Sequence, residues 1–339
     1  MIEFLQLLEE RRRTFIAQTA AETGMTEKAV EKDWWMTLVL RAIFTLPMSE
    51  HFVFKGGTSL SKGWGLIERL SEDIDIALAP QAFDREYRQT PTHSYVKTLK
   101  REGTTYTSTV IADALQAKLL EMGVPDTLFS LSVTLIPPTR PDTDPQTILV
   151  HYGSLYPANK YIADTVKVEF GVRALKEPFA DVSIVSEIGR HIQVSSYTEQ
   201  SFTVRAVVPE KTLIEKLLLL HEKFTGGIPD QIKIAERQSR HLADIVRLKR
   251  KGIHKEILAD PALFEAIVLH RRHYIRLRGV DYGQMTIATL QIVPPPAAEA
   301  KFREDYAAMR EEMIYGEAPD FDTILAELKE LTQFLQQKP

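Results

Sequence analysis

The 339-residue sequence contains no cysteine. Disulfide bonds, zinc sites with thiolate ligands and cysteine nucleophiles are therefore excluded. The absence suits a reducing cytoplasm, which is the location we expect. Long apolar runs are lacking too. None approaches the roughly 20 residues of a membrane-spanning helix, and residues 1–13 carry mixed charge without the apolar segment of a signal peptide. We expect no association with a membrane.

The sequence also lacks an excess of positive charge. It has 42 Lys and Arg residues against 46 Asp and Glu residues, a net charge of −4, so only a local basic surface could attract nucleic acid. With 44% hydrophobic and 26% charged residues, the composition is that of a globular protein with one large or two modest domains. Two phosphate-binding motifs are missing as well, the Gly-x-x-x-x-Gly-Lys-Ser/Thr loop and the Gly-x-Gly-x-x-Gly fingerprint.

What the sequence does contain is a strand followed by a double glycine. Residues 52–55 (Phe-Val-Phe-Lys) predict a short buried strand that runs into a turn at Gly56 and Gly57. Glycine lets the backbone approach a polyphosphate closely. A lone Gly-Gly pair is more often only a tight turn, so the turn alone does not establish a nucleotide site.

A helix is expected after this turn. Thr58 or Ser59 can cap it, and we expect it to carry Lys62 and to end near Arg69. Its N-terminal end would favour bound phosphate. Lys62 and Arg69 could neutralise phosphate charge, and a role on the helix surface is the alternative for each.

The next segment predicts a strand with two carboxylates on one face. Residues 74, 76 and 78 are apolar, and Asp73 and Asp75 alternate with them. Carboxylates at positions i and i+2 of a strand lie about 7 Å apart at Cα, so their oxygens can converge on one divalent ion or a close pair of ions. The alternative is a solvated strand face.

A third carboxylate, Glu169, lies on a later predicted strand, residues 165–173. Three strand carboxylates can hold two Mg²⁺ ions about 3.5–4 Å apart, an arrangement that activates a hydroxyl and stabilises leaving pyrophosphate. No soft ligand set is present, so Mg²⁺ or Mn²⁺ is the expected ion. An ion pair with Arg173 on the same strand face is the alternative role of Glu169.

The pattern of the whole chain predicts an α+β protein with a mixed β-sheet and flanking helices, followed by a helical lobe. Residues 2–48 and 81–122 favour helix, with Thr26 as the N-cap of a helix that reaches Phe44. Further strands are expected at 129–135, 147–152, 181–185, 191–195 and 202–208, and further helices at 211–224, 234–251, 260–277, 299–314 and 321–336. We expect two domains, 1–209 and 210–339, with the second completing an active-site cleft.

The helical lobe carries two groups of interest. Lys216, beside Glu215 on an apolar helix, could reach a nucleotide phosphate or form a surface ion pair, and Asp244 follows on a later helix. Two basic stretches, 249–251 and 270–278, could guide an RNA backbone with Tyr274 available for stacking. A solvated helix face is the alternative.

Five motifs occur in a fixed order: Lys55-Gly-Gly-Thr-Ser-Leu-Ser-Lys62, Arg69-Leu-Ser-Glu-Asp-Ile-Asp75, Val168-Glu-Phe-Gly-Val-Arg173, Thr212-Leu-Ile-Glu-Lys216 and Arg240-His-x-x-Asp244. Together they resemble the AbiEii/AbiGii toxin family of nucleotidyltransferases, in the DNA polymerase β-like superfamily. The resemblance also includes Glu31-Lys-Asp-Trp-Trp35 and Glu304-Asp-Tyr306, and so spans nearly the whole chain.

The resemblance implies a minimal nucleotidyltransferase fold, an NTP substrate and Mg²⁺. It matches Gly56, Gly57, Thr58 and Ser59 to the triphosphate-binding motif. It also matches Asp73 and Asp75 to the metal-binding pair. Lys216 and Asp244 match the later, catalytic motif that family members need for activity, and Glu169 matches a further motif on a strand.

By this resemblance the protein is expected to be the toxin of a bacterial toxin–antitoxin or phage-defence (abortive infection) system. It would transfer nucleotides from NTP to RNA, with the 3′ end of tRNA as acceptor, release pyrophosphate and block translation. We expect a monomer with a cognate antitoxin. Two alternatives stay open: transfer of a nucleotidyl or phosphoryl group to a protein such as the antitoxin, and a catalytically silent nucleotide-binding module.

Overall fold

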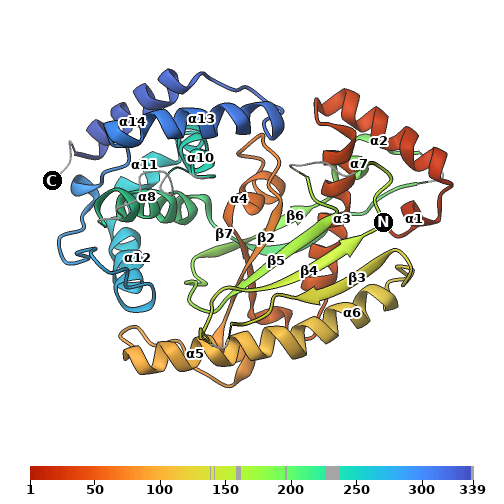
Figure 1. Cartoon of the computed structure of the whole chain (residues 1–339), viewed down its shortest axis with the longest axis horizontal. Helices are drawn as coiled ribbons and strands as arrows, with labels where there is room; N and C mark the ends of the chain where they lie inside the picture. Colours follow the sequence, from red (N-terminus) through yellow and green to blue (C-terminus); the bar gives the residue numbers. More distant parts are fainter. Residues whose placement is uncertain are drawn as a thin grey trace. The chain divides into compact units, whose positions relative to one another are not determined.

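The computed structural model describes residues 1–137, 139–140, 142–157, 162–194, 197–226, 235 and 237–336. It consists of two compact units (Figure 1). The first comprises Met1–Gly63, Leu70–Tyr87 and His93–Val207, and the second comprises Trp64–Arg69, Arg88–Thr92 and Val208–Pro339. The second unit thus contains two short segments from the N-terminal half of the chain. The predicted domain boundary between residues 209 and 210 stays a prediction.

The first unit is built on one seven-stranded sheet with the order β3-β4-β5-β2-β1-β7-β6. Its strands are β1 (Phe52–Lys55), β2 (Asp73–Leu78), β3 (Phe129–Val133), β4 (Gln146–Tyr152), β5 (Thr165–Gly171), β6 (Phe179–Ile184) and β7 (Phe202–Val207). The β2/β5 and β1/β7 pairs are parallel and the other pairs are antiparallel. The predicted α+β class with a mixed sheet is confirmed.

The pairing of the strands gives the sheet one apolar and one polar face at its centre. On β2, Ile74 and Ile76 are fully buried, whereas Asp73 and Asp75, which alternate with them, are only partly buried. Asp75 is aligned with Glu169 on β5 and with Lys55 on β1. Because aligned residues of paired strands point to the same face, these charged side chains form one row across three strands.

The first unit contains seven α-helices among its described residues. They are α1 (Glu3–Gln6), α2 (Glu9–Thr23), α3 (Glu27–Phe44), α4 (Gly56–Thr58), α5 (His93–Tyr106), α6 (Ala112–Glu121) and α7 (Glu187–His191). Of these, α3 and α6 contact the sheet at β5 and β3. Thr26 caps α3 as predicted, since its side chain accepts a hydrogen bond from the Ala29 amide. The Trp35 ring of α3 stacks on Tyr152 of β4 with ring centroids 5.0 Å apart. This contact places α3 on the core side of the sheet.

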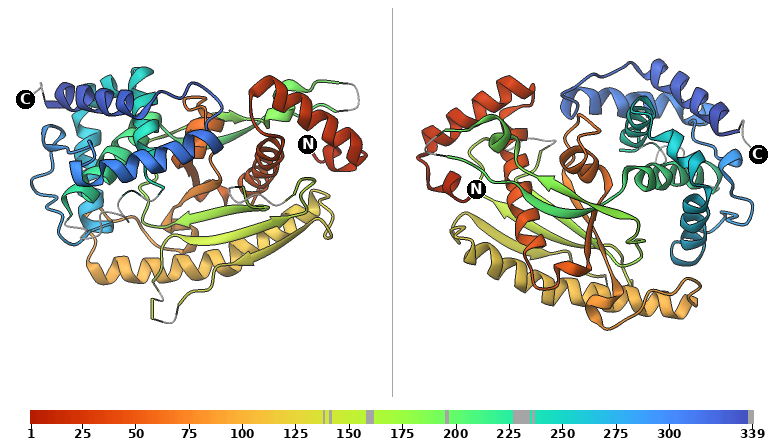
Figure 2. Two further views of the ribbon diagram at one scale, coloured as in Figure 1. Left: turned by 45° about the horizontal axis from the view of Figure 1, so that its top comes forward. Right: turned by 180° about the vertical axis from the view of Figure 1, so that it is seen from behind.

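The α5 and α6 helices form one continuous run, because a π-helical turn, Thr107–Ile111, joins them. Figures 1 and 2 show this run along the sheet, and it contacts β3 and β4. Gly103 of α5 allows the close approach: a Cβ atom there would lie 2.2 Å from the Cγ1 atom of Val172, which directly follows β5.

Two local predictions are wrong. The helix after the Gly-Gly turn consists of α4 and a π-helical turn that ends at Gly63, well before Arg69. Gly65 lies in the left-handed region with φ +61°, where a right-handed helix cannot continue. The strand expected at 191–195 is also wrong: His191 ends helix α7, which the Ser186 side chain caps by accepting from the Gly189 amide, and Val194 forms only an isolated bridge with Tyr197. Residue 195 lies outside the described residues.

The second unit is helical. It contains α8 (Pro209–Thr225), α10 (Ser239–Arg250), α11 (His254–Ala259), α12 (Pro261–Tyr274), α13 (Pro296–Glu312) and α14 (Phe321–Gln336). The predicted helices correspond to these except for α11, which was not predicted, and residues 234 and 236 lie outside the described part. The apolar stripe of α8 is fully buried at Leu213, Leu217 and Leu220. Among the described helices, none is long and apolar enough to cross a membrane.

Hydrogen bonds hold the two short segments in the second unit. The Tyr274 hydroxyl on α12 donates to the Arg88 carbonyl at 2.8 Å and accepts from the Arg88 amide at 3.1 Å. Arg69 pairs with Ile314 in an antiparallel bridge. The Tyr315 and Gly316 amides both donate to the Glu68 carbonyl.

The contact between Gly103 and Val172 can be tested by overpacking. We expect Gly103→Ala to lower the free energy of unfolding by about 1–3 kcal/mol, because the added methyl group overlaps a buried valine. Val172→Ala should remove most of the penalty, so that Gly103→Ala costs little in that background. Urea unfolding monitored by circular dichroism measures both effects. Gly153→Ala is the control, since its nearest neighbouring atom would lie at 3.7 Å. Equal losses at both glycines would contradict the packing described.

Candidate active site

The glycine turn lies directly against the carboxylate strand. Gly56 has φ +78°, and a Cβ atom on it would lie 2.3 Å from the Oδ2 atom of Asp75. Such a distance is a severe overlap, so only glycine fits. The Thr58 hydroxyl donates to the Asp73 carbonyl, and the Ser59 hydroxyl donates to the Gly56 carbonyl. The two halves of the motif predicted from sequence are therefore in contact.

Thr58 and Ser59 are buried, with 1% and 0% of their surface exposed. Their hydroxyl groups are engaged within the turn and with β2. Gly56 and Gly57 are only partly buried. If the turn binds a triphosphate, the glycine backbone is the part that can approach it.

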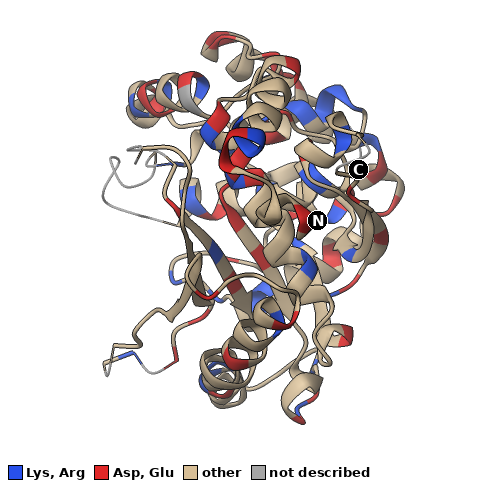
Figure 3. Ribbon diagram, turned by 90° about the vertical axis from the view of Figure 1, so that its right-hand side faces the viewer, with Lys and Arg blue, Asp and Glu red and all other residues tan. Residues whose placement is uncertain are grey.

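The row of charged residues next to the turn contains a lysine as well as carboxylates. Lys167 Nζ lies 2.5 Å from Glu169 Oε1 and 3.9 Å from Asp73 Oδ2. Partial burial lowers the pKa of Lys167, but Glu169, Asp73 and Asp75 outweigh it and raise the pKa of this ammonium group above its ordinary value. Figure 3 shows charged residues of both signs on the strands. The face accordingly accommodates a cation.

Lys167 was not singled out as a site residue from the sequence. Strand alternation already places it on the face of Glu169, but only the parallel pairing of β2 with β5 brings it opposite Asp73. The same pairing aligns Glu169 with Asp75. Arg173 forms an ion pair with Asp144 at 2.8 Å, and Glu169 forms one with Lys167.

The donor set of this face fits a hard divalent cation. Within the described part of the chain, no three His, Cys, Asp or Glu side chains are close enough to hold a metal ion. Mg²⁺, however, is commonly bound by one or two carboxylates together with substrate phosphates and water. Asp73 and Asp75 supply carboxylate oxygens beside a turn whose backbone can approach phosphate, and Glu169 stands next to them.

Lys62, predicted to contact phosphate, is buried in an ion pair. Its ammonium group binds the Asp33 carboxylate of α3, and both residues are 7% exposed. The other Asp33 oxygen accepts from the Glu187 amide at 2.8 Å. Asp33 thus joins the end of the turn to α3 and α7. The phosphate contact of Lys62 stays a prediction.

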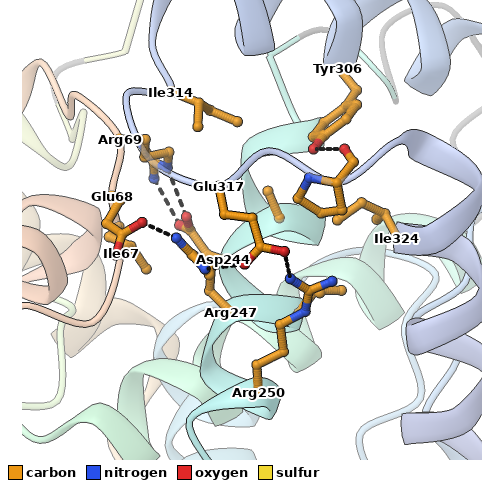
Figure 4. A pocket seen from close by; sticks show the side chains of 13 residues that line it. Ile67, Glu68, Arg69, Asp244, Arg247, Arg250, Tyr306, Ile314, Glu317 and Ile324 are labelled. Carbon is orange, nitrogen blue, oxygen red and sulfur yellow. Dashed lines mark hydrogen bonds and ion pairs between the residues drawn. The ribbon is translucent and has the colours of Figure 1, made fainter. Parts of the chain in front are cut away.

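The second unit brings three predicted residues together. Asp244 on α10 accepts two hydrogen bonds from Arg69, at 2.7 and 2.8 Å (Figure 4). It also forms an ion pair with Lys216 of α8, at 2.8 Å. All three are buried, and Asp244 is 1% exposed. Lys216 Nζ also lies 3.4 Å from Nδ1 of His241, a member of the Arg240-His-x-x-Asp244 motif that was not selected as a site residue. These residues form a buried charge cluster.

Burial and charge oppose each other at Asp244. Burial by itself raises the pKa of the carboxyl group, but Arg69 and Lys216 outweigh it and hold the pKa well below its usual range. At Lys216, burial lowers the pKa of the ammonium group, Asp244 raises it and Arg69 lowers it further, with a net decrease. Burial beside these cations also lowers the pKa of His241. Asp244 is therefore the anion on which the cluster depends.

A second set of ion pairs adjoins this cluster. Arg247 binds Glu68, and Arg250 binds Glu317 at 2.9 Å, around a cavity of about 30 Å³ (Figure 4). This volume is enough for a single water molecule.

Part of the basic stretches is engaged by acidic residues. Lys249 binds Glu330 at 2.6 Å, and Arg271 binds the buried Glu222. Tyr274 is 2% exposed and stacks on His270 with ring centroids 4.5 Å apart. The prediction that Tyr274 is available to stack on a base is therefore wrong. The residues of these stretches that are exposed include Arg272, Arg276 and Arg278.

The buried cluster predicts a large effect of one substitution. Asp244→Asn leaves Lys216 and Arg69 as buried cations without their carboxylate, so the free energy of unfolding should fall by about 3–5 kcal/mol. Asp322→Asn is the matched control. Asp322 pairs with Arg303 at 2.6 Å, but its side chain is 76% exposed, so the loss should be much smaller than for Asp244→Asn. Chemical denaturation measures both. A small loss of unfolding free energy in Asp244→Asn would show that the cluster does not stabilise the fold.

The family comparison covers both the turn and the buried cluster. The family model described as nucleotidyl transferase AbiEii toxin, type IV TA system, matches residues 38–327, which include Gly56, Asp75, Lys216 and Asp244. A search of curated proteins found no match. The resemblance stated from the motifs is confirmed over most of the chain. The chain therefore belongs to the AbiEii family of nucleotidyltransferase toxins of type IV toxin–antitoxin systems.

Proposed function

We propose that this nucleotidyltransferase uses Mg²⁺ or Mn²⁺ to transfer nucleotides from an NTP to an RNA acceptor, the 3′ end of tRNA, and so blocks translation. Membership of the family gives the transferase activity, the toxin class and an antitoxin partner. The metal, the triphosphate contacts and the RNA are the proposed parts.

The observation that carries the proposal is the contact between Gly56 and Asp75. The turn backbone and the carboxylate are so close that no side chain fits between them. A triphosphate held at Gly56 and Gly57 therefore has a carboxylate ligand for its metal within the same small region. Thr58 and Ser59 fix the turn in place through their hydrogen bonds.

The residues divide into two roles. Asp73 and Asp75, with Glu169 beside them, would hold the divalent ion, and Gly56 and Gly57 would hold the phosphates. The bound ion supplies charge stabilisation for the attacking hydroxyl group and for the leaving pyrophosphate. Lys216 and Asp244 support activity as positioning residues, because both are buried and bound to each other.

The transfer follows the in-line course of phosphoryl chemistry. The oxygen of the acceptor hydroxyl forms a bond to the α-phosphorus and its proton passes to solvent. The bond between the α-phosphorus and the bridging oxygen breaks, and pyrophosphate leaves with the electron pair. A nucleotide added to the 3′ end of tRNA converts the terminal 3′ hydroxyl group into a phosphodiester, so the original terminal nucleotide can no longer receive an amino acid there. Exposed arginines such as Arg272, Arg276 and Arg278 offer contacts to an RNA backbone.

The direct test incubates the protein with tRNA, each labelled NTP in turn, and Mg²⁺. We expect label at the tRNA 3′ end with the wild-type protein and at least a hundredfold less with Asp75→Asn, which removes a charged metal ligand. Asp181→Asn is the control, because Asp181 is an exposed residue of edge strand β6. Label on a co-purified protein in place of tRNA, or undiminished transfer in Asp75→Asn, would overturn the proposal.

A second test uses the glycine turn. Gly56→Ala should abolish transfer, since the added methyl group displaces the Asp75 carboxylate. Gly252→Ala is matched in backbone strain, with φ +82° against +78°, but has no atom within 4 Å of the added methyl group. It should keep full transfer activity despite a similar loss of stability. Thermal unfolding of both variants separates strain from the contact. Equal activities would contradict the assignment of Gly56.

A further inference from the structure

Lys167 stands among the carboxylates of the proposed metal site. Its Nζ atom is 2.5 Å from Glu169 Oε1 and 3.9 Å from Asp73 Oδ2, and its side chain is 40% exposed. The strand register explains the position: Asp73 is opposite Lys167 and Asp75 is opposite Glu169. A cation therefore lies where three carboxylates face one another on two parallel strands.

We propose that Lys167 is a positioning residue that acts as an internal counter-ion of this face. It holds Glu169 while no divalent cation is bound, and it competes with that cation for the same carboxylate. The inference rests on the proposed metal dependence and deepens it, because it names the group that sets the affinity for the metal.

Electrostatics requires a counter-ion here. Three carboxylates on adjacent strand positions repel one another, and like charges directly opposite in a sheet destabilise it. Lys167 neutralises part of this charge. It pairs with Glu169, its own neighbour at i+2, and approaches Asp73 across the strand boundary.

Geometry makes the lysine a competitor. Mg²⁺ needs carboxylate oxygens at about 2.0–2.1 Å, and an oxygen bound by an ammonium group at 2.5 Å has to give up part of that bond first. Lys167 has a flexible four-carbon stem and considerable exposure, so it can turn away from Glu169 without a change in the backbone. Metal binding and the Lys167–Glu169 pair therefore compete for that oxygen.

The experiment measures Mn²⁺ binding to the full chain without NTP, by calorimetry and by electron paramagnetic resonance. We expect Lys167→Met to tighten Mn²⁺ binding by roughly 3- to 10-fold, the effect of removing one positive charge a few ångströms away. Lys167→Arg keeps the charge and should bind Mn²⁺ as the wild type does. In a Glu169→Gln background, Lys167→Met should bring little or no gain.

Lys118→Met is the control for overall charge, because Lys118 pairs with Glu121 on α6, outside the carboxylate face. An equal gain in this variant would reduce the effect to net charge and overturn the inference. Unchanged or weaker Mn²⁺ binding in Lys167→Met would overturn it as well, as would weaker NTP binding with unchanged Mn²⁺ affinity. If Mn²⁺ binds to no variant, with or without NTP, the proposed metal dependence itself fails. Metal binding that is equal in wild type and Lys167→Met refutes only the role of Lys167.

Discussion

The close approach of a glycine backbone to a carboxylate is the constraint on which the rest of the first unit depends. Gly56 can lie against Asp75 only because it has no side chain and adopts a positive φ. The hydrogen bond from the Thr58 hydroxyl to the Asp73 carbonyl also holds the glycine turn against β2. The order of strands then follows: β1 and β2 must be neighbours, and β5 must lie beside β2 for Glu169 to face Asp75.

Buried ion pairs give the charged motifs of the sequence a structural role. Lys62 and Arg69 both follow the glycine turn, and each is committed to a buried carboxylate, Asp33 in the first unit and Asp244 in the second. Breaking such a pair costs more than the pair itself contributes, because it leaves an uncompensated buried charge. These motifs can therefore be needed for activity without touching the nucleotide.

Much of this could be predicted from local patterns. Period-2 alternation identified β2 and β5 and put Asp73, Asp75 and Glu169 on polar faces, and Thr26 marked the start of α3. What local patterns cannot supply is the pairing of distant segments. The position of Lys167 opposite Asp73 follows only from the register of β2 with β5. Tyr274 is buried and hydrogen-bonded to Arg88, which is far away in the sequence. The strand expected at 191–195 is wrong because helix α7, capped by Ser186, extends to His191.

The two short segments of the second unit determine which fragments of the chain contain all the residues of that unit. The chain enters the helical unit at 64–69, returns to the sheet, enters again at 88–92 and comes back for good at Val208. A gene fragment that encodes only the residues after 208 would lack Arg69, and with it one of the two cations that hold Asp244. The helical unit is therefore not encoded by one continuous stretch of the sequence. A fragment that keeps Arg69 with the helical unit must also include sequence between the glycine turn and the carboxylate strand, because Arg69 lies between Gly57 and Asp73.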